Sequence, residues 1–377
     1  MTENGDRPLR VHLVHQSFGD YVSALVDGFN IRDDVELTVT TITSGVATLS
    51  GLRSAAVDHR SRTVSRFRDP RSPIEAFRVV REVLRQPADL IHWQAAGNPW
   101  IDAWFSVLMG RTPTVVTVHD MVPHPGDGNV LPGTFAALGR VARKADLVTV
   151  HAPHVRDQAI EAGVDPASVA VVAHGELATR YLPPERLPLP VASEPSVLFF
   201  GRAQGYKGLD LLYDAMVRMN RSSVVARLVV AGSGPSIDRL VPAGEEPPTW
   251  CKIRSGHIPA DDVPGLFEEA SVVALPYREA SQSGVAALAA GFGKPVVATA
   301  VPGLVDIVED EVTGVLVEPN DPDRLAAAIA ELVVDPGALD RLGTGARSAA
   351  ETRLSWSVIT GELRDLYLGV LEERAGN

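Results

Sequence analysis

Short apolar segments alternate with helical patterns along the chain, and this alternation limits the fold more than any other feature of the sequence. The strand-like segments of the first half are Val11–His15, Leu37–Thr43, Leu90–Trp93, Thr114–His119, Leu147–His151 and Val169–Ala173. Helical patterns lie between most of them, for example at Tyr21–Phe29, Pro73–Leu84 and Gly133–Lys144. Strands that alternate with helices pair in parallel through right-handed crossovers. The first half is therefore predicted to be a doubly wound α/β domain.

The second half repeats this organisation after a proline-rich stretch, Tyr181–Pro195. Its predicted strands are Ser196–Phe200, Ala226–Ala231, Ser271–Leu275, Pro295–Ala298 and Gly314–Val317. Its predicted helices are Gly208–Met219, Val263–Ala270, Ala286–Gly291 and Asp323–Val333. Because 377 residues are too many for one ordinary core, we predict two domains, at 1–182 and 196–355. Residues 183–195 are the predicted linker, and 356–377 a C-terminal helix that packs back on the first domain.

Composition and charge exclude several classes of protein. The formal net charge of -12 argues against a general nucleic-acid binder. Cys251 is the only cysteine, so no internal disulfide can form, which fits a reducing compartment. The N-terminus lacks the apolar core of a signal peptide, and the apolar run Pro99–Met109 is shorter than the roughly 20 residues that span a bilayer. We predict a cytoplasmic protein.

One segment departs from the acidic average. Between Arg53 and Arg85 the sequence has nine arginines and four acidic residues. Such a surface could contact anionic lipid or a phosphorylated substrate. A solvated surface in an arginine-rich protein is the favoured interpretation. Peripheral membrane contact through this segment is therefore an alternative and not the main prediction.

Open parallel sheets bind ligands beyond the carboxyl ends of their strands, on the loops that lead into helices. One such loop, Gly201–Gly208, carries Arg202 and Lys207 among glycines and precedes a helix. The glycines allow close approach, the two cations neutralise negative charge, and the helix start adds backbone N–H groups. This loop is predicted to bind a diphosphate.

A second loop follows the strand that ends at Leu275 and reads PYREASQSG. Glu279 can accept hydrogen bonds from two sugar hydroxyls. The residues after it stand where the first N–H groups of the next helix are expected to lack partners: Ser281, Gln282, Ser283 and Gly284. The alternative is that Ser281 or Ser283 only caps this helix. Ligand binding is favoured, because capping does not require the glutamate.

His119 ends an apolar strand of the first half, where it could donate to a sugar hydroxyl or carbonyl; a structural hydrogen bond is the alternative. Two metal patterns are set aside. Asp321-Pro322-Asp323 matches the Asp-x-Asp pattern of metal-dependent sugar transferases, but it precedes a helical run and is predicted to be an N-cap. No histidine pair stands at zinc-ligand spacing beside a cysteine or carboxylate cluster. We predict no metal and no cofactor.

Taken together, these motifs resemble those of the retaining, GT-B-fold glycosyltransferases of family 4. In the first half they are VTVHD ending at Asp120 and VVAHGE at Val171–Glu176. In the second half they are FFGRAQGYKGLDLL at Phe199–Leu212, VVAGSGP at Val229–Pro235, GHIPADDVPGLFEEASVVALPY at Gly256–Tyr277, GKPVVAT at Gly293–Thr299 and VTGVLVEPNDPDRLAAAIAEL at Val312–Leu332. The resemblance covers most of the chain and is denser in the second half. It implies a GT-B fold, in which two Rossmann-like domains face a cleft.

The resemblance also implies roles for single residues. Arg202 and Lys207 would hold the donor diphosphate, and Gly19 and Gly201 would let the backbone approach it. Glu279 would hold the hydroxyls of the donor sugar, and His119 would lie over its far side. The remaining contacts, to the nucleotide base and to the sugar or phosphate, would come from Ile258 and from the backbone of Ser283, Gly284 and Val285.

Two positions depart from the family pattern. The family has a second glutamate on the helix, eight residues after the first, that holds the ribose. Here Ala287 stands at that spacing from Glu279, and alignment back from the GKP motif places Leu288 there instead. The first loop has Phe18-Gly19-Asp20 in place of the usual glycine pair. How the ribose is recognised is therefore an open question.

The resemblance thus implies a retaining, metal-independent hexosyltransferase that uses a nucleotide-diphosphate sugar. The acceptor would be a hydroxyl of a small molecule, a glycan or a lipid-linked compound. A degenerate partner that binds a sugar nucleotide and regulates another transferase is one alternative, and a nucleotide-sugar epimerase of the same fold is another. A phosphorylase would need a cofactor lysine site that the sequence does not show. The base, the sugar, the acceptor, the oligomeric state and membrane association stay open.

Overall fold

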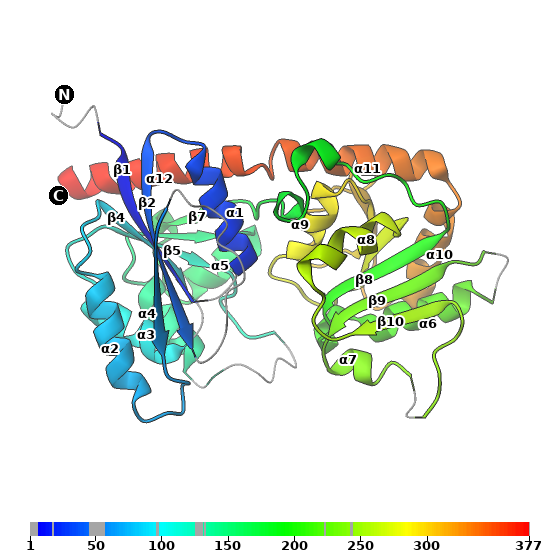
Figure 1. The fold of residues 1–377 in the computed structure, drawn as a ribbon, viewed down its shortest axis with the longest axis horizontal. Helices are drawn as coiled ribbons and strands as arrows, with labels where there is room; N and C mark the ends of the chain where they lie inside the picture. The colour runs from blue at the N-terminus through cyan, green and yellow to red at the C-terminus, as the bar shows by residue number, and fades with distance from the viewer. Residues whose placement is uncertain are drawn as a thin grey trace. The chain divides into compact units, whose positions relative to one another are not determined.

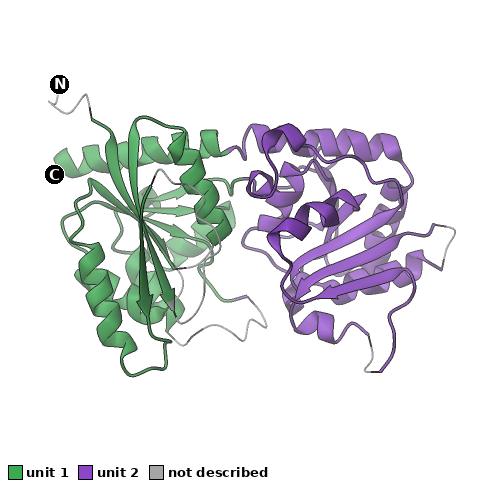
Figure 2. Ribbon diagram, viewed as in Figure 1, with its two compact units in different colours: residues 1–123, 129–175, 356–377 green, residues 124–128, 176–355 purple. Residues whose placement is uncertain are grey.

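The chain forms two compact units, each built on a parallel sheet with helices around it (Figure 2). The computed structural model describes residues 7–16, 19–44, 57–95, 98–124, 131, 133–221, 224–241 and 244–376. The first unit comprises residues 1–123, 129–175 and 356–377, and the second comprises residues 124–128 and 176–355. The predicted architecture of two doubly wound α/β domains is confirmed.

The sheet of the first unit has seven strands in the order β3-β2-β1-β4-β5-β6-β7. Their bounds are β1 Leu9–His15, β2 Val35–Ser44, β3 Asp58–Val64, β4 Leu90–Ala95, β5 Thr114–Val118, β6 Leu147–Val150 and β7 Val169–Val171. β5 and β6 are buried along their whole length, as expected for parallel strands with both faces covered. The strand order reverses between β1 and β4, and sheets of this type bind ligands beyond the strand ends at such a reversal.

Six α-helices of the described residues surround this sheet (Figure 1). They are α1 Gly19–Asn30, α2 Ser72–Val83, α3 Pro99–Leu108, α4 Thr134–Ala142, α5 Pro153–Glu161 and α12 Trp356–Gly376. Residues of α2, α3, α4 and α5 share one hydrophobic core with the sheet. α12 packs on α1, where a Cβ on Gly28 would lie 2.8 Å from Cβ of Trp356. Only a glycine therefore allows the two helices to come this close.

The sheet of the second unit has six strands in the order β10-β9-β8-β11-β12-β13. Their bounds are β8 Ser196–Arg202, β9 Arg227–Ser233, β10 Cys251–Ser255, β11 Val272–Leu275, β12 Val296–Thr299 and β13 Gly314–Val317. All the strand pairs are parallel. The order reverses between β8 and β11. The end of β8 at Arg202 and the loops that follow the two strands, which hold Lys207 and Glu279, are therefore neighbours.

The helices of the second unit are α6 Leu209–Met219, α7 Pro235–Asp238, α8 Val263–Glu268, α9 Gly284–Gly291, α10 Pro322–Val333 and α11 Pro336–Glu351. α6 packs beside α10, and α9 packs beside α11 (Figure 1). Asp321 is the N-cap of α10: its carboxylate accepts from the N–H groups of Asp323 and Arg324 at 3.1 and 2.9 Å. The predicted N-cap is thus confirmed.

The sequence patterns missed some elements. β3 reads DHRSRTV and lies at the edge of its sheet, where its side chains are mostly exposed or half-buried, so it lacks an apolar pattern. β10 is an edge strand with only one fully buried residue. The apolar run Pro99–Met109 contains α3, a helix of the first unit. The helices α5, α7 and α11 were also not predicted. Within the described ranges, no helix is long and apolar enough to cross a bilayer.

Several arginines of the basic segment pair with acids of the same segment. Arg62 forms an ion pair with Glu82, and Arg71 pairs with Asp69 at 2.7 Å. Arg53 lies outside the described residues. These pairs remove part of the positive charge on which a contact with anionic lipid would depend. Membrane contact through this segment stays the less favoured prediction.

The proline-rich stretch packs against the second unit. The two units divide after Gly175, so residues 183–195 lie in the second unit. Leu189 is buried, and its N–H donates to the carbonyl of Phe292 at 2.9 Å. The prolines exclude a regular helix or strand, but the backbone groups of the stretch still find partners in the unit that follows.

Lys294 binds the proline-rich stretch to the rest of the second unit. Its ammonium donates to the carbonyl oxygens of Pro190 and Ala270 at 2.6 and 3.0 Å, and the residue is 2% exposed. We expect Lys294→Met to lower the free energy of unfolding by about 2–3 kcal/mol at neutral pH, because buried carbonyl groups lose their donor. Chemical denaturation of both proteins measures this difference.

The difference in free energy of unfolding between the wild type and Lys294→Met is predicted to depend on pH. Burial lowers the pKa of Lys294 from 10.5 to about 8. Between these values the unfolded chain binds more protons than the folded one, so the stability of the wild type rises with pH in this window. The stability gap between wild type and Lys294→Met should therefore widen by about 3 kcal/mol across it. A gap that stays constant would contradict this prediction.

Candidate functional site

The loops after β8 and β11 contact each other closely in the second unit. Gly208, at the end of the first loop, has a φ of +64°, and a Cβ there would lie 1.9 Å from the carbonyl oxygen of Pro276 in the second loop. The N–H of Arg278 donates to the carbonyl of Tyr206 at 2.6 Å. At the other end of the first loop, a Cβ on Gly201 would lie 3.6 Å from a methyl carbon of Val285, at the start of α9. The predicted cation loop and the start of α9 therefore meet on one surface.

Among the described residues, the two predicted phosphate-binding cations have no acidic partner. Arg202 is exposed, and its guanidinium forms no hydrogen bond or ion pair with any residue that the structure describes. The ammonium of Lys207 lies 3.1 Å from the hydroxyl of Tyr277 and 4.7 Å from the centre of its ring. Arg278, in contrast, pairs with Asp210 at 2.7 Å. The positive charge of the Gly201–Gly208 loop is therefore not neutralised by the described residues of the protein.

The start of α9 combines a cap with open N–H groups. The hydroxyl of Ser283 accepts from the N–H of Ala286 at 3.2 Å, so the capping role considered for this serine is present. The N–H groups of Gly284 and Val285 have no acceptor among the described residues. These groups lie at the positive end of the helix dipole. Nearby, the side-chain oxygen of Gln282 is buried and has no partner in the described part of the chain.

Glu279 contacts a histidine that the sequence did not single out. Nδ1 of His124 lies 3.1 Å from a carboxylate oxygen of Glu279, and Nε2 lies 3.4 Å from the hydroxyl of Ser281. The ring of His124 stacks on Tyr206 with centroids 4.4 Å apart and an interplanar angle of 19°. Glu279 keeps 41% of its side chain exposed. One oxygen of the carboxylate therefore contacts His124, and the exposed part of the group is open to a ligand.

Sequence reasoning missed His124 and the tyrosines for different reasons. His124 comes from the short segment 124–128, which belongs to the second unit although the neighbouring residues on both sides belong to the first. No local pattern predicts such a contact. Tyr206 and Tyr277 stand inside the quoted motifs, directly before Lys207 and Arg278, and an aromatic residue next to a cation is a signal that could have been considered.

The other predicted residues have these positions. Ile258 is half-buried in the loop after β10, whose first residue, Gly256, donates from its N–H to the carbonyl of Gly232 at 2.7 Å. Gly19 begins α1 in the first unit. His119 follows β5 in the first unit, and is 1% exposed. Its Nε2 lies 3.2 Å from the side-chain oxygen of Gln94, so the structural hydrogen bond considered for it is present.

The two positions considered for the second family glutamate face the interior. Ala287 is 0% exposed and Leu288 is 3% exposed. An acid at either position would be buried without a partner, which is costly. No acid replaces them on α9, whose sequence is GVAALAAG.

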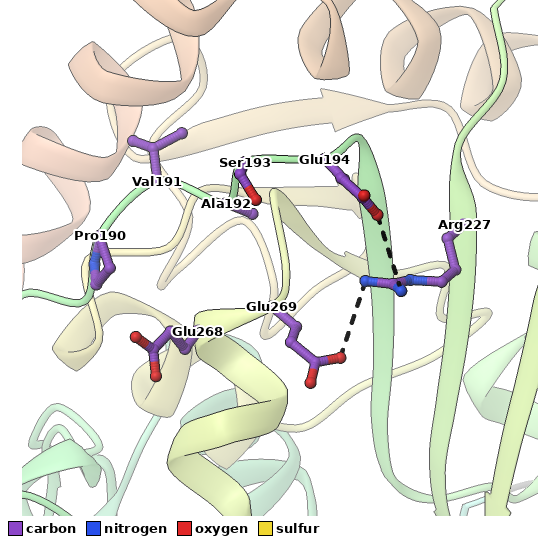
Figure 3. Close-up of a pocket in the computed structure, with 8 residues that line it drawn as sticks. All are labelled: Pro190, Val191, Ala192, Ser193, Glu194, Arg227, Glu268 and Glu269. Carbon is purple, nitrogen blue, oxygen red and sulfur yellow. Dashed lines mark ion pairs between the residues drawn. The ribbon is translucent and has the colours of Figure 1, made fainter.

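A cavity of about 260 Å³ lies in the second unit away from these residues (Figure 3). It is lined by the 190–194 stretch, Arg227 and the end of α8, and Arg227 lies 4.0 Å from Glu194 and 3.8 Å from Glu269. The cavity is at the start of β8 and β9, whereas ligands of parallel sheets bind beyond the strand ends. Among the residues that the structure describes, no group of three or more His, Cys, Asp or Glu side chains is placed to hold a metal ion.

Comparison with known proteins supports the sequence motifs. Residues 32–175 match the family described as Glycosyltransferase Family 4, and residues 194–335 match the family described as Glycosyl transferases group 1. A D-inositol 3-phosphate glycosyltransferase from Xylanimonas cellulosilytica is 32% identical over 309 residues, which cover 76% of this chain and 73% of that protein.

Solved structures support the fold. A sucrose-phosphate synthase from Thermosynechococcus elongatus has a TM-score of 0.75 and 20% identity, and the match covers 97% of this chain and 100% of that one. HepE from Anabaena, solved with UDP and glucose, has a TM-score of 0.72 and 20% identity over 96% of this chain and 100% of that one. At this identity the likeness shows the fold alone.

Proposed function

The chain belongs to glycosyltransferase family 4 and has the GT-B fold, and from this premise we propose a specific reaction. The protein moves a sugar from a nucleotide-diphosphate donor to a hydroxyl acceptor. The anomeric configuration is retained, and no metal ion takes part. One observation carries the proposal: Arg202 and Lys207 have no acidic partner among the described residues, and the segment Gly201–Gly208 that holds them contacts the start of α9 at Gly201.

The site residues of the second unit would act on the leaving group and on the sugar. A diphosphate gains negative charge as it leaves the sugar, and fixed positive groups stabilise that charge most where it develops. Arg202, Lys207 and the start of α9 supply such groups. Glu279 accepts hydrogen bonds from the sugar hydroxyls and fixes the orientation of the sugar.

Retention follows a same-face course in this proposal. The bond from the anomeric carbon to the diphosphate oxygen breaks, and the sugar becomes oxocarbenium-like. The acceptor hydroxyl attacks from the side of the leaving group and forms the new glycosidic bond. Its proton passes to the departing phosphate oxygen. No described side chain of the second-unit site is needed as a covalent nucleophile.

The relatives suggest the first compounds to try. HepE was solved with UDP and glucose, and several relatives are named D-inositol 3-phosphate glycosyltransferases. We therefore propose uridine diphosphate sugars as donors, and a phosphorylated cyclitol as acceptor. Ribose recognition would use groups other than those of α9, since Ala287 and Leu288 are buried.

Two measurements test this function. A thermal-shift screen against nucleoside diphosphates and their sugars should raise the melting temperature for the correct base, because a ligand that binds only the folded state stabilises it. NMR of the product formed with an inositol phosphate acceptor should then show the anomeric configuration of the donor. An inverted product, or no shift with any nucleotide, would reject the proposal.

A binding protein without activity is the second candidate, since both positions considered for the ribose-binding glutamate are apolar and buried. Such a protein would show a thermal shift with a nucleotide sugar but neither transfer nor slow hydrolysis of the donor. The same purified sample therefore separates the two candidates.

His124 is predicted to orient Glu279 for this reaction. Its Nδ1 contacts only one of the two carboxylate oxygens, which leaves the other for the sugar. We expect His124→Phe, which keeps a ring that can stack on Tyr206, to lower kcat/KM by about three- to tenfold, the effect of one lost hydrogen bond. Initial rates at varied donor concentration measure this. A variant with higher donor affinity would mean that His124 competes with the sugar instead.

A further inference from the structure

The unpaired arginines of the basic segment gather at α2 and at the turn before it, in the first unit. Five guanidinium groups there form no hydrogen bond or ion pair with any residue that the structure describes, and all five residues are exposed: Arg66, Arg68, Arg78, Arg81 and Arg85. The ion pairs of the segment therefore leave a group of free cations in one part of the first unit.

The helix α2, which packs beside α3, presents a row of these cations to the solvent (Figure 1). Ile74, Arg78 and Arg81 follow one another at spacings of four and three, so they share one face of the helix, and all three are exposed. Arg85 continues the row in the turn that ends the helix, where its N–H donates to the carbonyl of Glu82 at 3.2 Å. The buried residues of α2 belong to the core of the first unit.

The acidic side chains of the same region do not balance the five arginines. Glu82 pairs with Arg62, and Asp69 pairs with Arg71 at 2.7 Å, so each of these carboxylates offsets its own partner. Glu75 accepts from a backbone N–H at 2.7 Å and is the acid of α2 that has no arginine partner in the described part of the chain. An excess of positive charge therefore stays on this part of a protein whose formal net charge is -12.

Exposed apolar side chains accompany the cations. Ile74 is 57% exposed, and Trp100, at the start of α3, is 38% exposed. Trp100 stacks on Phe67 with ring centroids 5.9 Å apart, and its Nε1–H donates to the carbonyl of Phe67 at 3.2 Å, so its ring lies at the turn that holds Arg66 and Arg68. Apolar surface gains free energy when it leaves water, and tryptophan is enriched at the boundary between water and lipid.

We infer that this basic face, made of the exposed side of α2, the turn before it and the start of α3, docks the first unit on an anionic lipid bilayer. The arginines meet the lipid phosphates, and the side chains of Ile74 and Trp100 enter the boundary region of the bilayer. The sequence alone favoured a solvated surface for this segment, whereas the placement of the free cations beside exposed apolar side chains favours a contact.

The shape of the basic face favours a broad partner over a small one. Arg78 and Arg85 are seven residues apart, which is about 10 Å along a helix axis, so one small phosphorylated compound does not reach both. The face is the outside of a helix, and the described cavity of the chain lies in the second unit. A nucleic acid would meet the arginines but leave Ile74 and Trp100 without apolar contacts, whereas a bilayer satisfies both kinds of side chain.

Co-sedimentation of the full-length chain with phospholipid vesicles tests the inference. Vesicles of phosphatidylcholine and phosphatidylglycerol in equal parts are compared with vesicles of phosphatidylcholine alone, at about 0.1 M salt, where charges act over about 10 Å. We expect the chain to sediment with the anionic vesicles and not with the neutral ones. At about 1 M salt, where charges act over about 3 Å, most of this binding should be lost.

Two variants assign the binding to the basic face. A triple variant, Arg78→Gln with Arg81→Gln and Arg85→Gln, should bind anionic vesicles about 100-fold more weakly, since each arginine near such a surface contributes about a fivefold gain. Ile74→Ser should lower the same binding by about fivefold, because less apolar surface enters the bilayer. The four side chains are exposed, so the melting temperature should stay close to that of the wild type.

The matched control removes the same charge from the second unit. It replaces by glutamine three exposed arginines whose guanidinium groups also have no ion pair among the described residues: Arg221, Arg239 and Arg324. This variant should bind anionic vesicles within about twofold of the wild type, because its altered residues lie outside the basic face. An equal loss of binding in both triple variants would mean that only the total charge matters, and would overturn the inference.

Two further results would also overturn it. One is the absence of binding to anionic vesicles, and the other is binding to duplex DNA that the Arg78, Arg81 and Arg85 variant loses while vesicles stay unbound. Docking requires no sugar transfer, so a chain that proves inactive should still bind the vesicles. Conversely, transfer to a soluble acceptor without vesicles should be the same in the wild type and in this variant, because the altered side chains lie outside the proposed donor site.

Discussion

Arg202→Ala and Lys207→Ala should each lower kcat/KM for sugar transfer by about 10²- to 10³-fold, the usual cost of removing one preorganised group that stabilises developing charge. The reason is that each cation is uncompensated in the described protein and stands in the segment Gly201–Gly208, which contacts the start of α9 at Gly201. Binding of the nucleoside diphosphate itself should weaken in both variants. Steady-state kinetics and calorimetric titration with the diphosphate measure the two effects.

Arg218→Ala is the matched control for these variants. Arg218 is also an exposed arginine of the second unit, but it already pairs with Asp214 at 2.8 Å and Asp323 at 2.7 Å. Surface pairs of this kind contribute about 0–1 kcal/mol, so this change should leave transfer unaltered. Wild-type activity in Lys207→Ala, with a melting temperature equal to that of the control, would contradict the assignment of the phosphate site.

The parts of the fold that the sequence predicted are those fixed by local burial. Strands such as β5 are covered on both faces, so every residue is apolar or small, and the pattern marks them. β3 is an edge strand whose charged residues face water, and nothing in its composition distinguishes it from a loop. Local patterns therefore describe the centre of each sheet better than its edges.

In the candidate site, too, the residues of one local segment could be predicted, whereas contacts between distant parts of the sequence could not. Arg202 ends β8 and Lys207 follows five residues later, just before α6, so the place of both cations follows from one short local segment. The contact of His124 with Glu279 joins residues 155 positions apart, and the bond between His92 and Tyr367 joins residues 275 positions apart. Such contacts depend on tertiary packing, which a single sequence without an alignment does not reveal.

Glu279→Gln should separate recognition of the sugar from recognition of the diphosphate. The substitution keeps the shape of the side chain but removes the charge that strengthens hydrogen bonds from the sugar hydroxyls. We expect kcat/KM to fall by about 10²-fold, consistent with the loss of a charge-assisted hydrogen bond that acts on the reacting sugar. Affinity for the free nucleoside diphosphate should stay within about twofold of the wild type, since the carboxylate is assigned to the sugar alone.

This pattern is the opposite of the one expected for Lys207→Ala, which loses affinity for the diphosphate with or without its sugar. Titration of both variants with the diphosphate and with the intact donor therefore tests the two assignments against each other. If Glu279→Gln weakened binding of the free diphosphate as much as binding of the donor, the carboxylate would act through the structure of the loop. The contact of His124 with Glu279 at 3.1 Å would then be a structural pair, and the sugar would have to be held by other groups.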